Sequence, residues 1–281
     1  MTHSRPQIHE LLERHGLSAR REFGQNFVAD PNTVRRIASL ARVGEGDTVV
    51  EIGPGLGSLT LALIETGADV VAVEVDAGMA AAAREVVGDA ARIVEADALS
   101  VDWGELLTVD TTDTDATDND RRDVHVVANL PYNVGTTLIL DILERVEQVQ
   151  TLTVLVQAEV ADRLAADAGS KIYGIPSVIA SLYAEVDVVA KVPPTVFVPR
   201  PKVMSAVVRL VRKAETPDVD TTRLTSLVRA GFGQRRKMLR RSLNGLLDES
   251  QLVAADVSPT ARAEELDLDA WVRLASIDTQ P

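Results

Sequence analysis

Cysteine is absent from this sequence of 281 residues, and histidine occurs only four times. Without cysteine the chain has no disulfide bond, no thiolate nucleophile and no cysteine-based zinc site. Three of the four histidines lie within the first fifteen residues, which argues against a histidine-rich metal site in a folded core. We therefore expect a protein that binds no metal.

Long apolar runs are lacking too, since none approaches the roughly 20 residues that a membrane-spanning helix needs. Residues 1–10 hold no apolar segment of the signal-peptide type. Hydrophobic residues make up 46% of the chain and charged residues 25%, as in ordinary globular proteins. These features favour a cytoplasmic protein with no membrane partner, and we expect it to be monomeric.

Net positive charge is also missing, because the formal net charge is −13. Taken alone, this argues against a nucleic-acid partner, which needs clustered lysine and arginine. Exposed charges, however, interact over only about 8 Å at physiological salt, so a local basic patch can bind RNA on an acidic protein. Residues 223–241 contain seven basic residues and no acidic one.

This basic segment is a candidate RNA-binding surface, because a merely solvated helix face usually carries charges of both signs. The residues predicted to bind RNA are Arg235, Arg236, Lys237, Arg240 and Arg241. The spacing of four between Arg236 and Arg240 predicts that they lie on one helix face.

Strand-like and helix-like segments alternate from residue 47 onward. Apolar and β-branched runs predict strands at 48–52, 69–74, 92–94, 124–129 and 151–157. Helices are expected at 7–15, 31–42, 58–66, 77–88 and 135–147. The alternation predicts an α/β fold with a parallel, doubly wound, Rossmann-like sheet in a catalytic domain over 1–215. Strand signals stop after 211, so a small helical domain is expected at 216–281, and the basic segment within it makes this the candidate RNA-binding domain.

A glycine-rich turn, GlyProGlyLeuGly at 53–57, joins the first of these strands to a helix. Glycines let the backbone approach a ligand closely, and the helix start offers backbone N–H groups. Glu74 ends the next strand 21 residues after Gly53, which is the spacing of an acid that binds ribose hydroxyls. Gly53, Gly55 and Gly57 give GxGxG, not the dinucleotide pattern GxGxxG.

Preceded by Glu51, the turn resembles motif I of the S-adenosylmethionine-dependent methyltransferases. In that pattern an acid after the third strand, here Asp97, bonds the adenine amino group of the cofactor. Alternatively, Asp97 is only a loop residue or the cap of a helix. The predicted cofactor is S-adenosyl-L-methionine, with NAD as the alternative for the turn.

The strand at 124–129 ends on AsnLeuProTyrAsn, at the sheet edge where doubly wound folds bind ligands. An exocyclic adenine amine is a poor nucleophile, because its lone pair is delocalised into the ring. The Asn129 side-chain oxygen and the Leu130 or Pro131 carbonyl can accept its two N–H bonds and direct the lone pair at a methyl group. Tyr132 can stack on a base turned out of its helix. The alternative is an ordinary strand-ending turn.

Longer strings over nearly the whole chain resemble the rRNA adenine N6-dimethyltransferases of the small-subunit type. They are PheGlyGlnAsnPheVal at 23–28, the two motifs above, ValGlnAlaGluValAlaAspArgLeu at 156–164, ValPheValProArgProLysValMetSerAlaValValArgLeu at 196–210 and PheGlyGlnArgArgLysMetLeuArgArgSerLeu at 232–243. The resemblance implies dimethylation of N6 on two adjacent adenines in the 3′-terminal hairpin of 16S rRNA. The implied partner is the 30S ribosomal subunit or its precursor, late in subunit biogenesis.

The same resemblance implies roles for single residues. Asn26 and Val28 would lie in a segment that folds over the cofactor. The other implied cofactor positions are Gly53, Gly55, Glu74, Asp97 and Asn129. Phe197 would sandwich the target adenine opposite Tyr132, unless it is a core phenylalanine. Phe23 and Phe27 stay undecided between packing and covering the cofactor.

Four further bases could extend the RNA surface: Arg20, Arg21, Arg200 and Lys202. Two other functions are kept open. One is a large-subunit rRNA adenine N6-methylase of the antibiotic-resistance type, against which the basic C-terminal string argues. The other is a ribosome-assembly or RNA-binding factor in which methylation is secondary.

Overall fold

The structure, a computed structural model, describes residues 2–19, 25–107 and 123–277. The chain divides into two compact units, one of residues 1–161 with 187–212 and one of residues 162–186 with 213–281. The expected boundary at 215/216, with 162–186 in the first domain, differs from this division. The difference arises because α8 (Ile175–Tyr183) packs against α9 (Thr221–Gly233) within the second unit.

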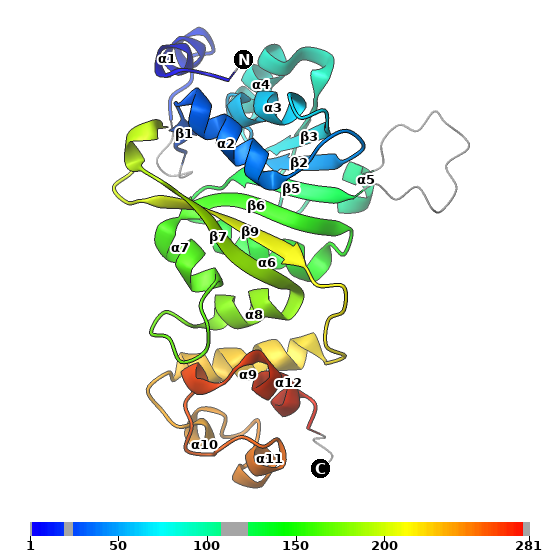
Figure 1. Cartoon of the computed structure of the whole chain (residues 1–281), viewed down its shortest axis with the longest axis vertical. Helices are drawn as coiled ribbons and strands as arrows, with labels where there is room; N and C mark the ends of the chain where they lie inside the picture. The colour runs from blue at the N-terminus through cyan, green and yellow to red at the C-terminus, as the bar shows by residue number, and fades with distance from the viewer. Residues whose placement is uncertain (1, 20–24, 108–122, 278–281) are drawn as a thin grey trace, which may run out of the picture. The chain divides into compact units, whose positions relative to one another are not determined.

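Among the described residues, seven strands form a sheet in the order β4-β3-β2-β5-β6-β9-β7 (Figure 1). The strands are β2 (Thr48–Ile52), β3 (Asp69–Glu74), β4 (Arg92–Glu95), β5 (Val124–Asn129), β6 (Val149–Gln157), β7 (Ala184–Val192) and β9 (Ser205–Arg212). The doubly wound α/β fold is confirmed. The sheet is mixed, however, because β9 pairs antiparallel with β6, and the sequence analysis predicted neither β7 nor β9.

Helices follow the strands much as predicted. The first unit contains α1 (Arg5–Arg14), α2 (Pro31–Ala41), α3 (Ser58–Ile64), α4 (Ala77–Val87), α5 (Trp103–Leu107), α6 (Gly135–Arg145) and most of α7 (Ala158–Leu164). Its short strands β1 (Phe27–Val28) and β8 (Phe197–Val198) pair antiparallel. Local chemistry sets the helix starts: the Asp30 carboxylate accepts the Thr33 N–H at 2.9 Å, and Pro31 takes the first helical position.

The second unit is helical. Besides α8 and α9 it contains α10 (Leu239–Ser242), α11 (Glu249–Ala254) and α12 (Leu268–Ala275). Its core centres on Trp271, which is fully buried and packs against Phe232, with ring centroids 6.1 Å apart. A side chain at Gly231 would place its Cβ 2.7 Å from the Trp271 ring, so only glycine permits this packing of α9 on α12.

One face of the sheet in the first unit carries α2, α3 and α4. Val49 of β2 lies in the core beneath α2 and α3, while Ala72 of β3 packs against α4. Residues two apart in a strand share a face, and so do residues paired across parallel strands. Glu51, which follows Val49 by two and pairs with Ala72, therefore points to this helix-covered face.

Arg212, at the end of β9, is the residue that closes the end of α6. Its guanidinium donates to the Val149 carbonyl at 2.7 Å and to the Leu143 and Val146 carbonyls at 3.0 Å. Leu143 lies in the last turn of α6, where carbonyls lack helical partners, Val146 is the C-cap residue, and Val149 begins β6.

We predict that Arg212→Ala lowers the free energy of unfolding by roughly 2–3 kcal/mol, because three carbonyls lose a charged donor. Arg212→Lys should recover only part of this loss, since an ammonium group does not reproduce the planar fork. Urea unfolding measures both, with Arg35→Ala as a control that removes only an exposed ion pair to Glu65. Equal urea midpoints for Arg212→Ala and Arg35→Ala would contradict the capping role.

Candidate functional site

A cavity of about 620 Å³ lies at the carboxyl ends of β2, β3 and β5. The sheet order changes direction here, because β3 and β5 flank β2 on opposite sides. Ten predicted site residues line this cavity: Asn26, Val28, Gly53, Gly55, Glu74, Asp97, Asn129, Leu130, Pro131 and Tyr132. Glu51 also lines the cavity. It pairs with Ala72 of β3 and with Val127 of β5. Glu74 and Asn129 follow these two partners by two residues, so their side chains point to the same face of the sheet as Glu51.

The glycine-rich turn is held to the end of β3. Gly53 and Gly55 have φ angles of 70° and 54°, which favour glycine. The Gly55 N–H donates to Glu74 Oε2 at 3.0 Å, and the Asp76 N–H donates to Glu74 Oε1 at 3.0 Å. A Cβ at Gly55 would lie 2.9 Å from the Phe27 ring, so Phe27 closes over the turn.

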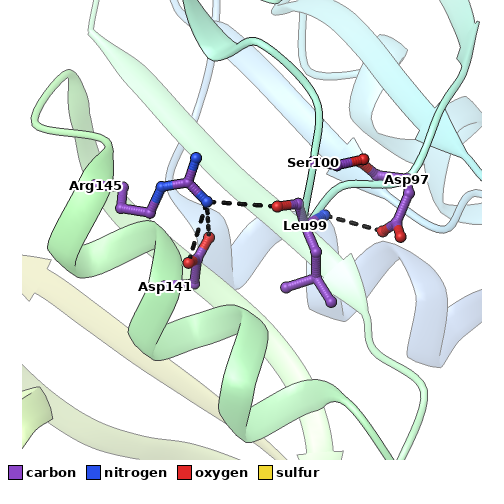
Figure 2. Close-up of polar contacts among 5 residues, drawn as sticks. All are labelled: Asp97, Leu99, Ser100, Asp141 and Arg145. Carbon is purple, nitrogen blue, oxygen red and sulfur yellow. Dashed lines mark hydrogen bonds and ion pairs between the residues drawn. The ribbon is translucent and has the colours of Figure 1, made fainter.

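The loop after β4 brings Asp97 to the cavity. Figure 2 shows the polar contacts that hold this loop. Asp97 Oδ1 accepts the Leu99 N–H at 3.0 Å. The side chain is therefore a local cap, which is the alternative to adenine binding that the sequence left open. Arg145 of α6 donates to the Leu99 carbonyl at 3.4 Å and pairs with Asp141 at 3.2 Å. The loop is thus tied to α6 while Asp97 stays exposed to a ligand.

The orientation of the Asn129 amide follows from one hydrogen bond. Its Nδ2 donates to the Asn26 backbone carbonyl at 2.8 Å. Because a carbonyl only accepts, the bonded atom is the amide nitrogen, and Oδ1 is left to accept from a ligand. The bond also joins the end of β5 to the segment that was expected to fold over the cofactor.

The hydrogen bonds of the structure distinguish the Leu130 and Pro131 carbonyls, the two candidates to accept an N–H of the adenine amine. The Pro131 carbonyl accepts the Val134 and Gly135 N–H groups at 3.3 and 3.1 Å, at the start of α6. Within the described residues no backbone N–H bonds the Leu130 carbonyl outside regular helices and strands. Of the two carbonyls considered from the sequence, the structure therefore favours Leu130.

Tyr132 is fixed by a residue that the sequence analysis did not identify. Its hydroxyl lies 2.6 Å from Ser205 Oγ, and Ser205 is fully buried on β9. Burial raises the pKa of the Tyr132 hydroxyl, so the group stays protonated. No role was predicted for Ser205, because no sequence pattern indicated that β9 pairs beside β6.

Phe197 does not lie where the family resemblance placed it. Its ring has no exposed surface, does not line the cavity and packs in the core with Val127 and Leu155. It pairs through its backbone with Val28, which is itself buried. In this structure Phe197 is a core residue and is not among the residues that line the cavity with Tyr132. Phe27, in contrast, lines the cavity, whereas Phe23 lies outside the described residues.

The charge of the cavity has one sign. Its described lining residues include four carboxylates, Glu51, Glu74, Asp76 and Asp97, and no lysine, arginine or histidine. Burial raises the pKa of Glu51 to about 8, the Thr60 hydroxyl lowers it, and the charge of Glu74 raises it. Burial raises the pKa of Glu74 as well. Such a cavity favours a cationic ligand and disfavours an anionic one.

The basic segment of the second unit is not one helix. Helix α9 ends at Gly233 and α10 begins at Leu239, so the predicted helix face with Arg236 and Arg240 is wrong. Arg235 is half-buried, pairs with Glu264 at 2.6 Å and donates to the Lys171 carbonyl at 2.8 Å.

The side chains that stay exposed in this segment are Arg236, Lys237, Arg240 and Arg241. Arg240 lies 3.8 Å from Glu249. In the first unit Arg200 and Lys202 are exposed too, whereas Arg20 and Arg21 lie outside the described residues.

No metal site or membrane span was found in the ranges that the structure describes. These ranges hold no cluster of three or more potential metal ligands among histidine, cysteine, aspartate and glutamate. They also contain no helix long and apolar enough to cross a membrane.

We predict that Glu51→Gln changes the pH dependence of stability. The pKa of Glu51 is about 8 in the folded protein and about 4.5 without burial, so protonated Glu51 favours the folded state. This contribution is complete below about pH 4.5 and is lost as the pH rises to about 8. Relative to the wild type, Glu51→Gln should gain roughly 2–4 kcal/mol in unfolding free energy across that window.

Urea unfolding at several pH values measures this difference. Glu95→Gln is the matched control, because Glu95 is exposed and does not line the cavity. Its difference from the wild type should stay flat with pH. A flat difference for Glu51→Gln as well would show that Glu51 does not titrate in this window.

The profile of the family described as "Ribosomal RNA adenine dimethylase" matches residues 16–280 of the chain. A Corynebacterium glutamicum (strain R) protein named "Ribosomal RNA small subunit methyltransferase A" is 43% identical over 279 residues, covering 96% of this chain and 93% of that protein. A protein of the same name from Phenylobacterium zucineum (strain HLK1) is 44% identical over 271 residues, covering 96% and 92%.

Two solved structures share the fold. A dimethyladenosine transferase from Plasmodium falciparum has a TM-score of 0.70 at 22% identity and covers 87% of this chain and 94% of that chain. The 23S rRNA methyltransferase ErmE has a TM-score of 0.65 at 26% identity and covers 88% and 97%. Since the family profile and the bacterial relatives span nearly the whole chain, this protein belongs to the ribosomal RNA adenine dimethylases, which are S-adenosylmethionine-dependent methyltransferases.

Proposed function

We propose that this protein dimethylates N6 of two adjacent adenines in the 3′-terminal hairpin of 16S rRNA, with S-adenosylmethionine as the methyl donor. The observation that carries the chemistry is the Asn129 amide, whose nitrogen is held by Asn26 so that its oxygen can accept from an adenine amine. Support for the substrate comes from the relatives named as small-subunit enzymes, at 43–44% identity, against 26% for the 23S enzyme.

The cavity fits the cofactor by charge. S-adenosylmethionine supplies a methyl group on a positively charged sulfur and has a net positive charge, whereas NAD carries two negative phosphates. Four lining carboxylates and no described cation favour the former. The chain would hold it with the turn at Gly53 and Gly55, with Glu74 at the ribose and with Asp97 at the adenine amino group.

The catalytic residues act by orientation. The Asn129 oxygen and the Leu130 carbonyl accept the two N–H bonds of the target amine, and Tyr132 stacks on the base. The ring plane of Tyr132 is set by Ser205 through the 2.6 Å contact between their hydroxyl oxygens. No strong base is required, because the amine proton leaves only after the nitrogen has gained the methyl group. Positioning of this kind can contribute about 7–11 kcal/mol.

The exposed bases of the second unit would contact rRNA phosphates in the 30S subunit or its precursor, late in biogenesis. We infer that the protein acts as a cytoplasmic monomer. A ribosome-assembly role in which methylation is secondary is the second candidate, since the same phosphate contacts would serve it.

We predict that Asn129→Ala lowers methyl transfer by roughly 100- to 1000-fold, because one acceptor of the target amine is lost. Binding to unmethylated small subunits should stay nearly unchanged. Tritiated methyl transfer with mapping of the labelled nucleotides measures the first, and sedimentation with the subunits measures the second. Asn32→Ala, which removes an exposed amide from α2, serves as the control.

Two results would redirect the proposal. Label in large-subunit RNA would contradict the substrate. Normal small-subunit maturation in cells that carry only Asn129→Ala would favour the assembly role over methylation as the main function.

We also predict that reversing Arg236, Lys237 and Arg241 to glutamate weakens binding to small subunits. Each lost phosphate contact should reduce the slope of log affinity against log salt by about 0.7–0.9. Arg235→Ala is the contrast: it should lower the stability of the second unit and leave that slope unchanged, because Arg235 is paired with Glu264. Unchanged binding by the triple variant would rule out this surface.

A further inference from the structure

Glu51 is a buried carboxyl group that the mechanism above does not use. It is 1% exposed. The Thr60 hydroxyl is near enough to lower the pKa of Glu51, yet within the described residues neither Thr60 Oγ1 nor Glu51 Oε2 has a hydrogen-bond partner. A buried polar atom without a partner is costly and calls for an explanation. Glu51 lines the cavity that would receive the methyl donor, so a ligand there is the natural partner.

The groups around Glu51 do not compensate an ionised carboxylate. Glu74 of β3 adds negative charge, and α3 contributes only the Thr60 hydroxyl. Asp76 before α4 and Asp97 after β4 line the same cavity, and no basic side chain does so among its described residues. Positive charge at this place therefore has to come from the ligand.

The donor and its product differ by one unit of charge. The donor carries a sulfonium, an ammonium and a carboxylate, and so has a net charge of +1. S-adenosylhomocysteine, the product, has a neutral thioether and no net charge. We propose that Glu51 is the residue by which the site distinguishes the two: its carboxyl group is protonated in the free protein, ionised in the donor complex and protonated again in the product complex.

The proton balance of this cycle closes. Glu51 releases one proton to solvent when the donor binds, because the sulfonium charge favours the carboxylate. It takes one proton from solvent once the sulfur is neutral. The proton that leaves the methylated amine is separate and goes to solvent. The inference rests on S-adenosylmethionine being the donor, as stated under the proposed function.

The direction of the pH dependence follows from this linkage. Burial raises the pKa of Glu51 to about 8, so the free protein holds this proton at neutral pH. Donor affinity should then rise with pH by up to about tenfold per unit and level off above about pH 8. Product affinity should show no such rise, so the preference for donor over product increases with pH.

Calorimetric titration of the full chain with S-adenosylmethionine and with S-adenosylhomocysteine tests the proposal. Titrations near pH 7 in two buffers of different ionisation enthalpy count the protons released. We expect close to one proton released with the donor and none with the product. Glu51→Gln should release none with either ligand, bind the donor about tenfold more weakly and bind the product as the wild type does. Glu95→Gln should behave as the wild type.

Thr60→Val provides a second variant, should Glu51→Gln fold poorly. It removes the hydroxyl that lowers the pKa of Glu51, so the pH at which donor affinity levels off should move upward. The proposal is overturned if the wild type releases equal numbers of protons with both ligands, or if Glu51→Gln keeps the wild-type pH dependence. A wild-type chain that binds neither ligand would instead overturn the cofactor assignment.

Discussion

The parallel pairing of β2 with β3 on one side and β5 on the other is the constraint on which the site depends. Its register sets Glu51 opposite Ala72 and Val127, so that Glu74 and Asn129 follow on the same face. The carboxylate of Glu74 and the amide of Asn129 thus reach one cavity from opposite sides of β2. A shift of one residue in either pairing would turn one of them to the other face of the sheet.

The acidic side chains of the cavity lower the stability of the protein without ligand. Four carboxylates share a cavity that offers them no described cation, and the deepest of them has an unpartnered oxygen. Backbone N–H groups from Gly55 and Asp76 satisfy Glu74, but nothing comparable reaches Glu51. As proposed above, a cationic ligand would favour the ionised form of Glu51 and so link ligand charge to proton binding at this residue.

Local patterns were enough to predict the strand, glycine turn and helix at 48–64 and the strand that ends on Asn129. Contacts between distant segments were not predictable. Ser205 reaches Tyr132 only because β9 pairs antiparallel with β6. Phe197 was expected to contact the target adenine because of the family resemblance, but its side chain is fully buried in the core. The sequence likewise did not indicate that Arg235 would be neutralised by Glu264, which lies 29 residues away.

The proposed methyl transfer requires that a fixed amide and a backbone carbonyl orient the amine of an adenine. The most direct measurement is a crystal structure of the protein with S-adenosylhomocysteine and an RNA hairpin that contains the target adenines. We expect N6 to lie about 2.7–3.2 Å from both Asn129 Oδ1 and the Leu130 carbonyl oxygen, with the Tyr132 ring against the base. An Asn129 amide nitrogen turned toward the base, or an N6 held by other residues, would contradict it.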